Sequence, residues 1–313
     1  MTPLFCTALV SLHLGASPVS AGASGRDGPL EVCALDATTY VLREPLASTP
    51  EAPFLYLLIG RERALLLDTG DVADPAVMPV ARTVLALLPT AGTGKLPLLV
   101  VHTHGHRDHR EGDGQFAGVP GVELVPARVD ALAARFGFSR WPQGAAVVEL
   151  GQRSVDLLPA PGHHPAELVF YDRNTALVFS GDFLLPGRLL VDDRAVYAAS
   201  ARRLADFVRD LPVRAVLGGH IEKDAHGELF GWQAPVHPDE ASLALPRADL
   251  LALPAALDAF NGFYDTRGSF VLVAPIRLLW VAGLGALLVV GTGGWLVVRV
   301  LRRWRRRRRG ASR

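Results

Sequence analysis

Short apolar runs alternate with helix-like segments from about residue 30 to residue 230, and Gly, Pro and Asp residues separate them. Apolar runs bounded by turn residues are typical of buried strands, whereas a 3.6-residue apolar period indicates a helix. Strands are predicted at 30–35, 39–44, 54–60, 63–70, 96–102, 122–127, 148–151, 154–159, 167–172, 176–182 and 214–220, and helices at 75–88, 128–136 and 198–211. The first four strands are expected to form a meander, and Arg173-Asn174 the turn of a hairpin. This order favours an α/β layered fold over a helical bundle or a pure sandwich.

The stretch between Arg277 and Arg299 contains 21 residues without a charge, and nine arginines but no acidic residue lie in the last fifteen positions. A helix of that length spans roughly 30 Å, the thickness of the hydrocarbon core of a bilayer. We therefore predict a transmembrane helix at 277–299, with the membrane as a partner, and a cytoplasmic Arg-rich tail at 300–313 by the positive-inside rule. Residues 233–276 are expected to form a closing helix and a juxtamembrane linker.

The first 23 residues combine an apolar run with small residues after it, which is typical of a secretory signal peptide. No Lys or Arg precedes the run, so a misplaced start codon or an uncleaved anchor stays open. With the tail in the cytoplasm, the domain formed by 24–232 is expected in the periplasm or outside the cell. Because removal of the N-terminus would take Cys6 away from Cys33, we expect no disulfide framework and treat Cys33 as an inert core residue.

The charge of the chain is uneven. Positions 1–298 carry 23 basic and 31 acidic residues, a net charge of −8, although the whole chain has a formal charge of +1. A part that acidic is a poor candidate for binding a polyphosphate backbone, which draws on Lys and Arg. We therefore predict a small-molecule substrate and no nucleic-acid partner, and we leave the oligomeric state open.

A cluster of polar residues follows the strand predicted at 96–102, in the sequence VVHTHGHRDH. His104, His106, Asp108 and His109 fall within six residues at the end of this strand, where sites on sheets usually form. Neutral imidazole and carboxylate are the ligands that zinc and similar first-row metals prefer. Metal coordination also offsets the several kcal/mol that such groups cost when they are buried without partners. The cluster therefore predicts a metal site.

Four further residues of ligand type stand at the ends of strand-like runs: Asp68, His163, Asp182 and His220. Each one alone is a weak signal, because a His or Asp beside Gly is usually an ordinary turn residue. In this order, together with the cluster at 104–109, they resemble the metallo-β-lactamase superfamily, whose pattern is Asp, then His-x-His-x-Asp-His, then His, Asp and His. The resemblance covers roughly residues 30 to 225.

The resemblance implies a fold and a set of ligands. The implied fold is the αββα sandwich, two mixed sheets back to back with helices outside. The implied ligands are His104, His106 and His163 for a first metal, Asp108, His109 and His220 for a second, and Asp182 as a bridge between both. Asp68 would support the site without binding metal. The implied cofactors are two Zn²⁺ per chain, with iron or manganese as alternatives.

Two metal ions about 3.5 to 4 Å apart lower the pKa of water and give a hydroxide near neutral pH. The resemblance thus implies a hydrolase acting on an ester, thioester, lactone or similar small molecule, with Asp108 as the catalytic residue that orients the hydroxide. Asp182 favours the branch that resembles hydroxyacylglutathione hydrolase, because true zinc β-lactamases lack the bridging aspartate. A β-lactamase-like drug hydrolase and a non-catalytic metal-binding envelope sensor are the alternatives.

Residues beside the ligands carry weaker expectations. His164 replaces the small hydroxyl residue that commonly follows His163, and we expect it at the surface or behind the ligands. His102 is expected to pack at the end of its strand. Arg107 and Arg110 are expected in solvent, with reception of an anionic substrate group as the alternative.

Overall fold

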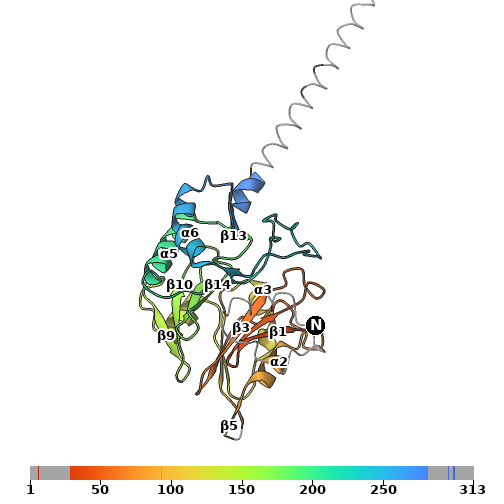
Figure 1. Ribbon diagram of the computed structural model, residues 1–313, viewed down its shortest axis with the longest axis vertical. Helices are drawn as coiled ribbons and strands as arrows, with labels where there is room; N and C mark the ends of the chain where they lie inside the picture. Colours follow the sequence, from red (N-terminus) through yellow and green to blue (C-terminus); the bar gives the residue numbers. More distant parts are fainter. Residues whose placement is uncertain (1–5, 7–28, 93, 281–294, 296–298, 300–313) are drawn as a thin grey trace, which may run out of the picture.

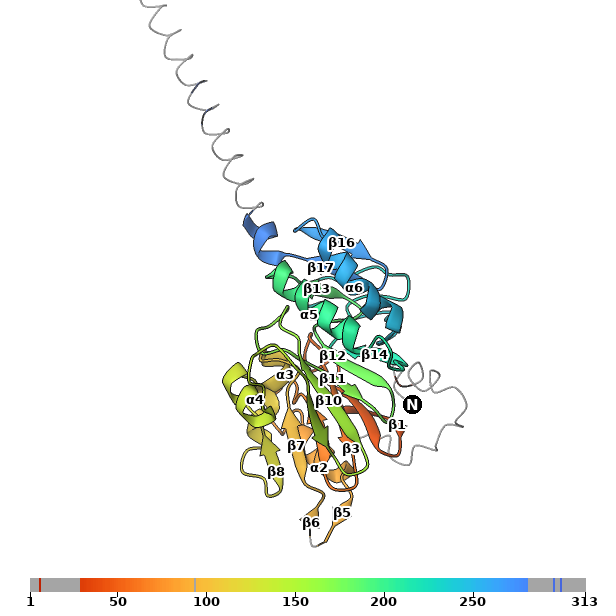
Figure 2. The same ribbon diagram turned by 90° about the vertical axis from the view of Figure 1, so that its left-hand side faces the viewer.

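Two six-stranded sheets lie face to face in the computed structural model, which describes Cys6, residues 29–92 and 94–280, Trp295 and Arg299 (Figure 1). Helices cover the outer faces of both sheets (Figure 2). The first sheet has the strand order β1-β2-β3-β4-β7-β8, and the second has the order β15-β14-β12-β11-β10-β9. The predicted αββα sandwich is confirmed.

The first sheet begins as the predicted meander and ends with two parallel strands. Its strands are β1 (Glu31–Asp36), β2 (Thr39–Arg43), β3 (Phe54–Ile59), β4 (Ala64–Leu67), β7 (Leu98–Val101) and β8 (Val122–Leu124). Strands β1 to β4 pair antiparallel, whereas β4 with β7 and β7 with β8 pair parallel. Two parallel neighbours need a crossover, which α2 (Val80–Leu87) provides between β4 and β7, beside the small hairpin of β5 (Thr90–Ala91) and β6 (Gly94–Lys95).

The second sheet contains the predicted hairpin. Its strands are β9 (Ala146–Glu149), β10 (Ser154–Pro159), β11 (Leu168–Asp172), β12 (Leu177–Gly181), β14 (Ala215–Gly218) and β15 (Ala244–Leu245), and α4 (Val129–Phe136) precedes them. Between β12 and β14 runs α5 (Arg194–Phe207), which starts four residues earlier than predicted. It starts there because the Asp193 side chain caps the helix by accepting hydrogen bonds from the backbone N–H groups of Ala195 and Val196.

Residues 233–276 hold more regular structure than a linker. They contain β15, α6 (Arg247–Ala259), β16 (Tyr264–Arg267) and β17 (Phe270–Val273). A three-stranded sheet of order β13-β17-β16 forms here, in which β17 pairs parallel with β13 (Arg188–Leu190). Helix α6 packs beside α5 on the outer face of the second sheet (Figure 2). This segment is therefore tied to the strand that borders the site described below.

The core consists of three layers, and β3 shows why its sequence is apolar without alternation. Phe54, Tyr56 and Leu58 point between the two sheets, where they pack with residues of the second sheet. Leu55 and Leu57 point the other way, under α2. Because successive side chains leave a strand on opposite faces, a strand that is covered on both sides must be apolar at every position.

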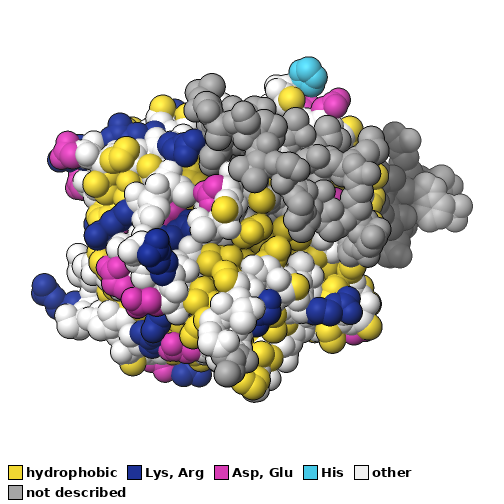
Figure 3. Space-filling model, turned by 60° about the horizontal axis from the view of Figure 1, so that its bottom comes forward, with side chains coloured by type: hydrophobic (Ala, Val, Ile, Leu, Met, Phe, Trp, Pro, Cys, Tyr) yellow, Lys and Arg dark blue, Asp and Glu magenta, His cyan; other side chains and the backbone are white. Residues whose placement is uncertain are grey.

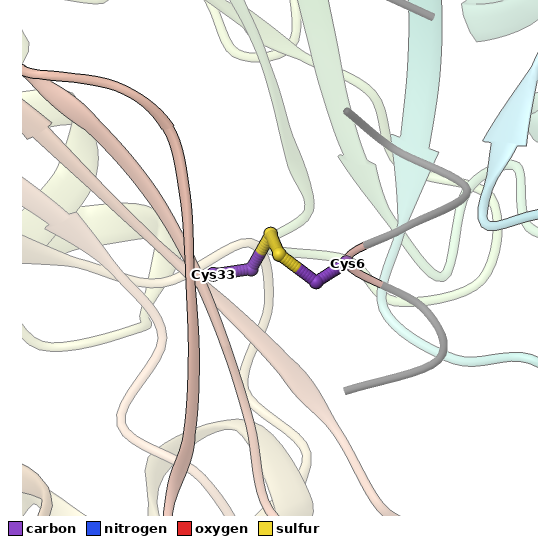
Figure 4. The surroundings of a disulfide bond; sticks show 2 residues. All are labelled: Cys6 and Cys33. Atoms are coloured by element: carbon purple, nitrogen blue, oxygen red, sulfur yellow. A yellow bond between two sulfur atoms is a disulfide. The ribbon is translucent and has the colours of Figure 1, made fainter. Parts of the chain in front are cut away.

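A disulfide bond joins Cys6 to Cys33 on β1 (Figure 4). This corrects the expectation that Cys33 is an unpaired core residue. That expectation rested on the loss of Cys6 with the N-terminus, and no spacing rule connects two cysteines 27 residues apart in sequence. The rest of residues 1–23 lies outside the described residues, and the signal peptide stays a prediction.

The predicted C-terminal transmembrane helix is corrected by the structure. Within the described part of the chain, none of the helices combines the length and the apolar character that crossing a bilayer requires. The prediction relied on the length of an uncharged run alone, and only 277–280 and two single residues of the predicted span are described. The remainder of 277–299 and the Arg-rich tail at 300–313 lie outside the described residues.

Basic and acidic side chains are mixed on the surface. On the face drawn in Figure 3, Lys and Arg side chains are interspersed with Asp and Glu. Mixed charge on this face offers no continuous basic stripe for a nucleic-acid backbone. The absence of a nucleic-acid partner stays a prediction.

Candidate metal centre

The candidate ligands gather where the strands of both sheets end. Asp68 directly follows β4, and His104 to His109 follow β7 of the same sheet, the last four of them in and around the short helix α3 (Arg107–Arg110). Asp182 and His220 come after β12 and β14 of the second sheet, and His163 lies in the loop between β10 and β11. The sandwich thus brings together residues from five loops.

The first group consists of three histidines, His104, His106 and His163. The Nδ1 atom of His106 lies 3.0 Å from Nε2 of His104 and 2.9 Å from Nε2 of His163. The rings of His104 and His163 stand edge to face with their centroids 4.9 Å apart. Three ring nitrogens therefore converge on one point. We refer to these three residues as group 1.

The second group consists of Asp108, His109, Asp182 and His220. The Nε2 atoms of His109 and His220 lie 3.1 Å apart, and Oδ2 of Asp108 is 3.3 Å from the first and 3.2 Å from the second. Oδ1 of Asp182 lies 3.5 Å from both nitrogens. We refer to these four residues as group 2.

Asp182 faces both groups. While its Oδ1 belongs to group 2, its Oδ2 lies 3.6 Å from Nε2 of His163 and 4.0 Å from Nε2 of His104. Oδ1 is buried and has no hydrogen-bond partner among the described residues. A buried carboxylate oxygen without a donor is costly unless a cation satisfies it. Group 1 offers three imidazoles, and group 2 offers two imidazoles and two carboxylates. These donors fit a pair of divalent metal ions.

Burial controls the electrostatics of group 1. It holds the pKa of His104 well below the ordinary value, and it lowers the pKa of His163 to about 4. Neighbouring histidines add to the effect, since a charge on one disfavours a charge on the next. His104 and His163 are consequently neutral at pH 7, the form in which imidazole binds a metal.

In group 2 the carboxylates raise the pKa values of the histidines instead. Burial lowers the pKa of His109 and His220, but Asp182 and Asp108 outweigh it, so that the pKa of His109 lies well above its ordinary value and that of His220 rises to about 9. Burial likewise opposes ionisation of Asp108 and Asp182, yet the nearby histidines hold both pKa values far below the usual range. Group 2 therefore contains carboxylates paired with protonated imidazoles.

Partners of the other ring nitrogen orient the histidines of group 2. Nδ1 of His109 lies 2.9 Å from Oδ2 of Asp68, and Nδ1 of His220 lies 2.7 Å from the carbonyl oxygen of Glu51. Both contacts place a proton on Nδ1 and leave Nε2 facing group 2. Asp68 also accepts hydrogen bonds from the backbone N–H and the hydroxyl of Thr103. It thus lies beside the site as a support.

Two buried residues beside the groups, Glu167 and His102, received no site role from the sequence. Oε2 of Glu167 accepts hydrogen bonds from the backbone N–H groups of His163 and His164, at 3.2 and 3.3 Å. His102, expected only to pack, donates from Nδ1 to the carbonyl of His109, and its Nε2 lies 3.1 Å from Asp113. Burial opposes a charge on His102, but Asp113 and Asp68 raise its pKa to about 9. The sequence offered a weak signal for both residues. His102 stands just before the ligands at 104–109, and Glu167 stands four residues after His163.

Glycine is required where the backbone passes the carboxylate of Asp182. A Cβ atom on Gly219 would lie 2.5 Å from Oδ1 of Asp182 and 2.8 Å from the ring of His109. Gly181 has a φ of +51° and leaves no room for a side chain against Thr103. Only glycine accepts both restrictions without displacing the ligands.

A cavity of about 160 Å³ opens over both groups. His106, Asp108, His163, Asp182 and His220 form its floor. Its walls come from β13 and the loop before it, from the loop before β3 and from the segment that follows β14, and they include Leu185, Arg188, Leu190, Phe230 and Trp232. Side chains of both groups are thus accessible to a small molecule.

Arg107 and Arg110 do not line this cavity. The Arg107 side chain is 73% exposed and donates to Glu111, and Arg110 donates to the carbonyl of Gly105. Both therefore lie toward solvent, as expected. His164 packs its ring against His104 and His106, with centroids 5.6 and 5.0 Å apart, and also lies outside the cavity lining.

Residues 48–220 match the family model described as Metallo-beta-lactamase superfamily. The chain belongs to the metallo-β-lactamase superfamily. The matched region contains the whole of group 1 and group 2, together with Asp68 and Glu167.

Two curated relatives are named as a thioesterase and as a hydrolase. The chain is 28% identical over 208 residues to acyl-coenzyme A thioesterase MBLAC2 of Gallus gallus, which covers 56% of this chain and 75% of the relative. It is 34% identical over 216 residues to a hydroxyacylglutathione hydrolase of Anaeromyxobacter dehalogenans, which covers 65% of this chain and 73% of the relative. The predicted similarity to the hydroxyacylglutathione hydrolases is thus confirmed at modest identity.

A solved structure shows the same fold. The crystal structure of a metallo-β-lactamase from Erythrobacter litoralis aligns with a TM-score of 0.51 at 17% identity, over 75% of this chain and 99% of that one. At that identity the likeness speaks for the fold alone. The structure brings all seven predicted ligands of the superfamily together, and metal binding by them stays a prediction.

Proposed function

We propose that this protein is a metal-dependent hydrolase with a binuclear centre, zinc in the first instance, that cleaves a thioester, ester or lactone of a small acyl compound. The observation that carries the proposal is Asp182, which directs one carboxylate oxygen toward each group. A single carboxylate between three imidazoles on one side and an Asp-His-His set on the other suits a shared ligand of two cations.

The chain's own residues supply binding and orientation. His104, His106 and His163 would hold one ion, Asp108, His109 and His220 the other, and Asp182 both. Bound there, divalent ions would polarise a carbonyl oxygen and lower the pKa of water. Asp108 lies on the cavity floor and is ionised, so its carboxylate is placed to accept a hydrogen bond from the attacking water and orient it.

Thioesters are the first substrates to test. The relatives named above are an acyl-coenzyme A thioesterase and a hydroxyacylglutathione hydrolase, and both names describe hydrolysis at a thioester carbon. The fold alone would not support this choice, because one fold serves many reactions. The bridging position of Asp182 and the named relatives together favour the thioester.

The test is turnover of a substrate panel by the full chain. Acyl thioesters, a phenyl ester, a lactone, a phosphodiester and a β-lactam are assayed after zinc loading, after removal of metal with a chelator, and after zinc is restored. We expect hydrolysis of a thioester, ester or lactone that disappears with the chelator and returns with zinc. Bound metal without turnover of any of these three classes would overturn the proposal.

We also propose that the domain works outside the cytoplasm. The Cys6–Cys33 disulfide supports this location, because disulfides persist in oxidising compartments and are rare in the cytosol. Trapping of free thiols in intact cells, on chains that mass spectrometry shows to retain Cys6, tests it, since such a chain in the cytoplasm would present Cys33 as a free thiol.

A further inference from the structure

The segment Glu222–Glu240, after β14, forms one wall of the cavity above the two groups. We call it the wall segment. Short bridges between Lys223 and Leu229 and between Asp224 and Glu240 close it on itself. Glu240 pairs with both terminal nitrogens of Arg43, and Nζ of the buried Lys223 donates to the carbonyl of Gly268. The wall segment is therefore held in place at both of its ends.

Arg188 on β13 is the centre of this wall. Its guanidinium donates to the carbonyl oxygen of Phe230. Its backbone N–H donates to Oε2 of Glu222 at 2.5 Å, and a guanidinium nitrogen lies 3.4 Å from Oε1 of the same carboxylate. Its guanidinium carbon also lies 5.6 Å from the centroid of the Trp232 ring, within the range of a cation–π contact. Arg188 is the one arginine among the described cavity-lining residues, and its guanidinium already contacts Glu222, Phe230 and Trp232 of the wall.

Apart from Gln233 and His237, the remaining wall surface is apolar and aromatic. Leu185, Leu190, Ile221, Phe230 and Trp232 line it. The ring of Phe230 stacks on His237 with centroids 4.1 Å apart and an interplanar angle of 6°, which fixes its orientation. Trp232 lines the cavity, and 64% of its surface is exposed. An exposed Trp beside a pocket offers contact area to a ligand at low entropic cost.

The charged side chains of the wall do not favour an anion. Glu51 and Glu222 are acidic, and Arg188 already has a carboxylate partner. An anionic group that packed against the wall, away from the floor, would lose water without gaining an unengaged cation from the wall side chains. The cavity volume of about 160 Å³ includes the space above the two groups, so the part beside the wall accommodates a group no larger than a benzene ring.

We propose that the wall segment and β13 form an acyl pocket that selects a neutral, apolar group of about the size of a benzene ring next to the scissile bond. Trp232 is the specificity-determining residue of this pocket. This inference rests on the proposed function, because it names the part of the substrate that lies above the two groups.

The experiment compares acyl groups on one small neutral leaving group, N-acetylcysteamine, with the zinc-loaded full chain. We expect kcat/KM for the phenylacetyl thioester to exceed that for the acetyl thioester about tenfold. The kcat/KM for the butyryl thioester should exceed that for the anionic succinyl thioester by at least the same factor. A succinyl thioester that is cleaved as well as the butyryl thioester would overturn the proposal.

Trp232→Ala is expected to raise KM for the phenylacetyl thioester about tenfold and to change its kcat by no more than about twofold. Both KM and kcat for the acetyl thioester should stay within about twofold of the wild-type values. Trp232→Phe retains a ring and should keep the wild-type KM. The matched control is Phe263→Ala, which removes another exposed aromatic ring that does not line the cavity. An equal effect of Trp232→Ala on all acyl groups, or the same effect of Phe263→Ala, would contradict the role of Trp232.

A binding measurement separates this inference from the proposed function. Phenylacetamide carries the apolar group without a readily hydrolysed bond, so ligand-observed NMR reports on the pocket without turnover. Binding to the wild type and to Phe263→Ala, with loss in Trp232→Ala, would support the pocket even if no thioester is cleaved. Turnover without acyl preference and without phenylacetamide binding would overturn the pocket alone.

Discussion

Group 1 and group 2 lie side by side, yet they are opposite in electrostatic character. Group 1 has three imidazoles, of which His104 and His163 are kept neutral by burial. Group 2 has two carboxylates that hold protons on His109 and His220. Two of the three imidazoles of group 1 are therefore neutral donors, whereas group 2 is a network of ion pairs. The difference shows that one cavity floor can offer two unlike sites, so the two metal equivalents that we propose would be separable by experiment.

Asp182→Asn is expected to have the largest effect, because this carboxylate faces both groups. Loss of its charge should weaken both metal equivalents and lower kcat/KM about 10³-fold, equivalent to roughly 4 kcal/mol of transition-state stabilisation. Asp108→Asn should weaken one equivalent only, since Asp108 lies within group 2. Stepwise metal titration and steady-state kinetics check both variants.

The control for these variants is Asp258→Asn, an exposed carboxylate whose partner is Arg202 on the surface. It should bind two equivalents and turn over as the wild type does. If Asp182→Asn lost only one equivalent, the shared position of Asp182 would be wrong.

Glu167→Ala is expected to have an intermediate effect, confined to group 1. Removal of its carboxyl leaves the backbone N–H groups of His163 and His164 without an acceptor, so the loop that carries His163 can shift. Loss of such supporting partners typically costs 10–100-fold in metal affinity. Chelator competition should show one equivalent weakened by about that factor and the other nearly unchanged. Glu167→Gln keeps an acceptor oxygen and should bind both equivalents normally, whereas equal loss in both variants would exclude the positioning role.

The smallest expected effect is a difference in proton release. In group 2 the metal must displace protons from His109 and His220, whose pKa values are raised, in the latter case to about 9. The affinity of group 2 should therefore rise as the pH increases from 7 to 9, because fewer protons compete. The pKa values of His104 and His163 are lowered, the latter to about 4, so these two ligands should add almost no pH dependence to group 1 in that window.

Calorimetry in two buffers of different ionisation enthalpy measures the released protons. His163→Ala leaves group 2 intact and should release close to two protons on metal binding at pH 7, one each from His109 and His220. His220→Ala leaves group 1 intact and should release close to none. Equal proton release from both variants would contradict the proposed electrostatic difference between group 1 and group 2.

The ligands could be predicted from the sequence because most of them are local. His104, His106, Asp108 and His109 lie within six residues after one strand, so a single loop predicts a metal site without knowledge of the fold. The strands themselves were predictable, because β3 and its neighbours are apolar on both faces and bounded by turn residues. Both predictions depend only on spacing along the chain.

Features that depend on contacts between distant segments could not be predicted in this way. Arg188 meets Phe230 and Trp232 only because β13 and the wall segment lie together in the fold. The pairing of Cys6 with Cys33 likewise follows from three-dimensional proximity. The predicted transmembrane helix rested on apolar length alone, and the described part of the chain contains no helix that could cross a bilayer.

The central claim, a binuclear centre with Asp182 between two unlike groups, is tested most directly by counting metal ions. Elemental analysis of the full chain, loaded with zinc and desalted, should give two equivalents for the wild type and one for His163→Ala, whose group 2 is complete. One equivalent or less in the wild type would contradict the account.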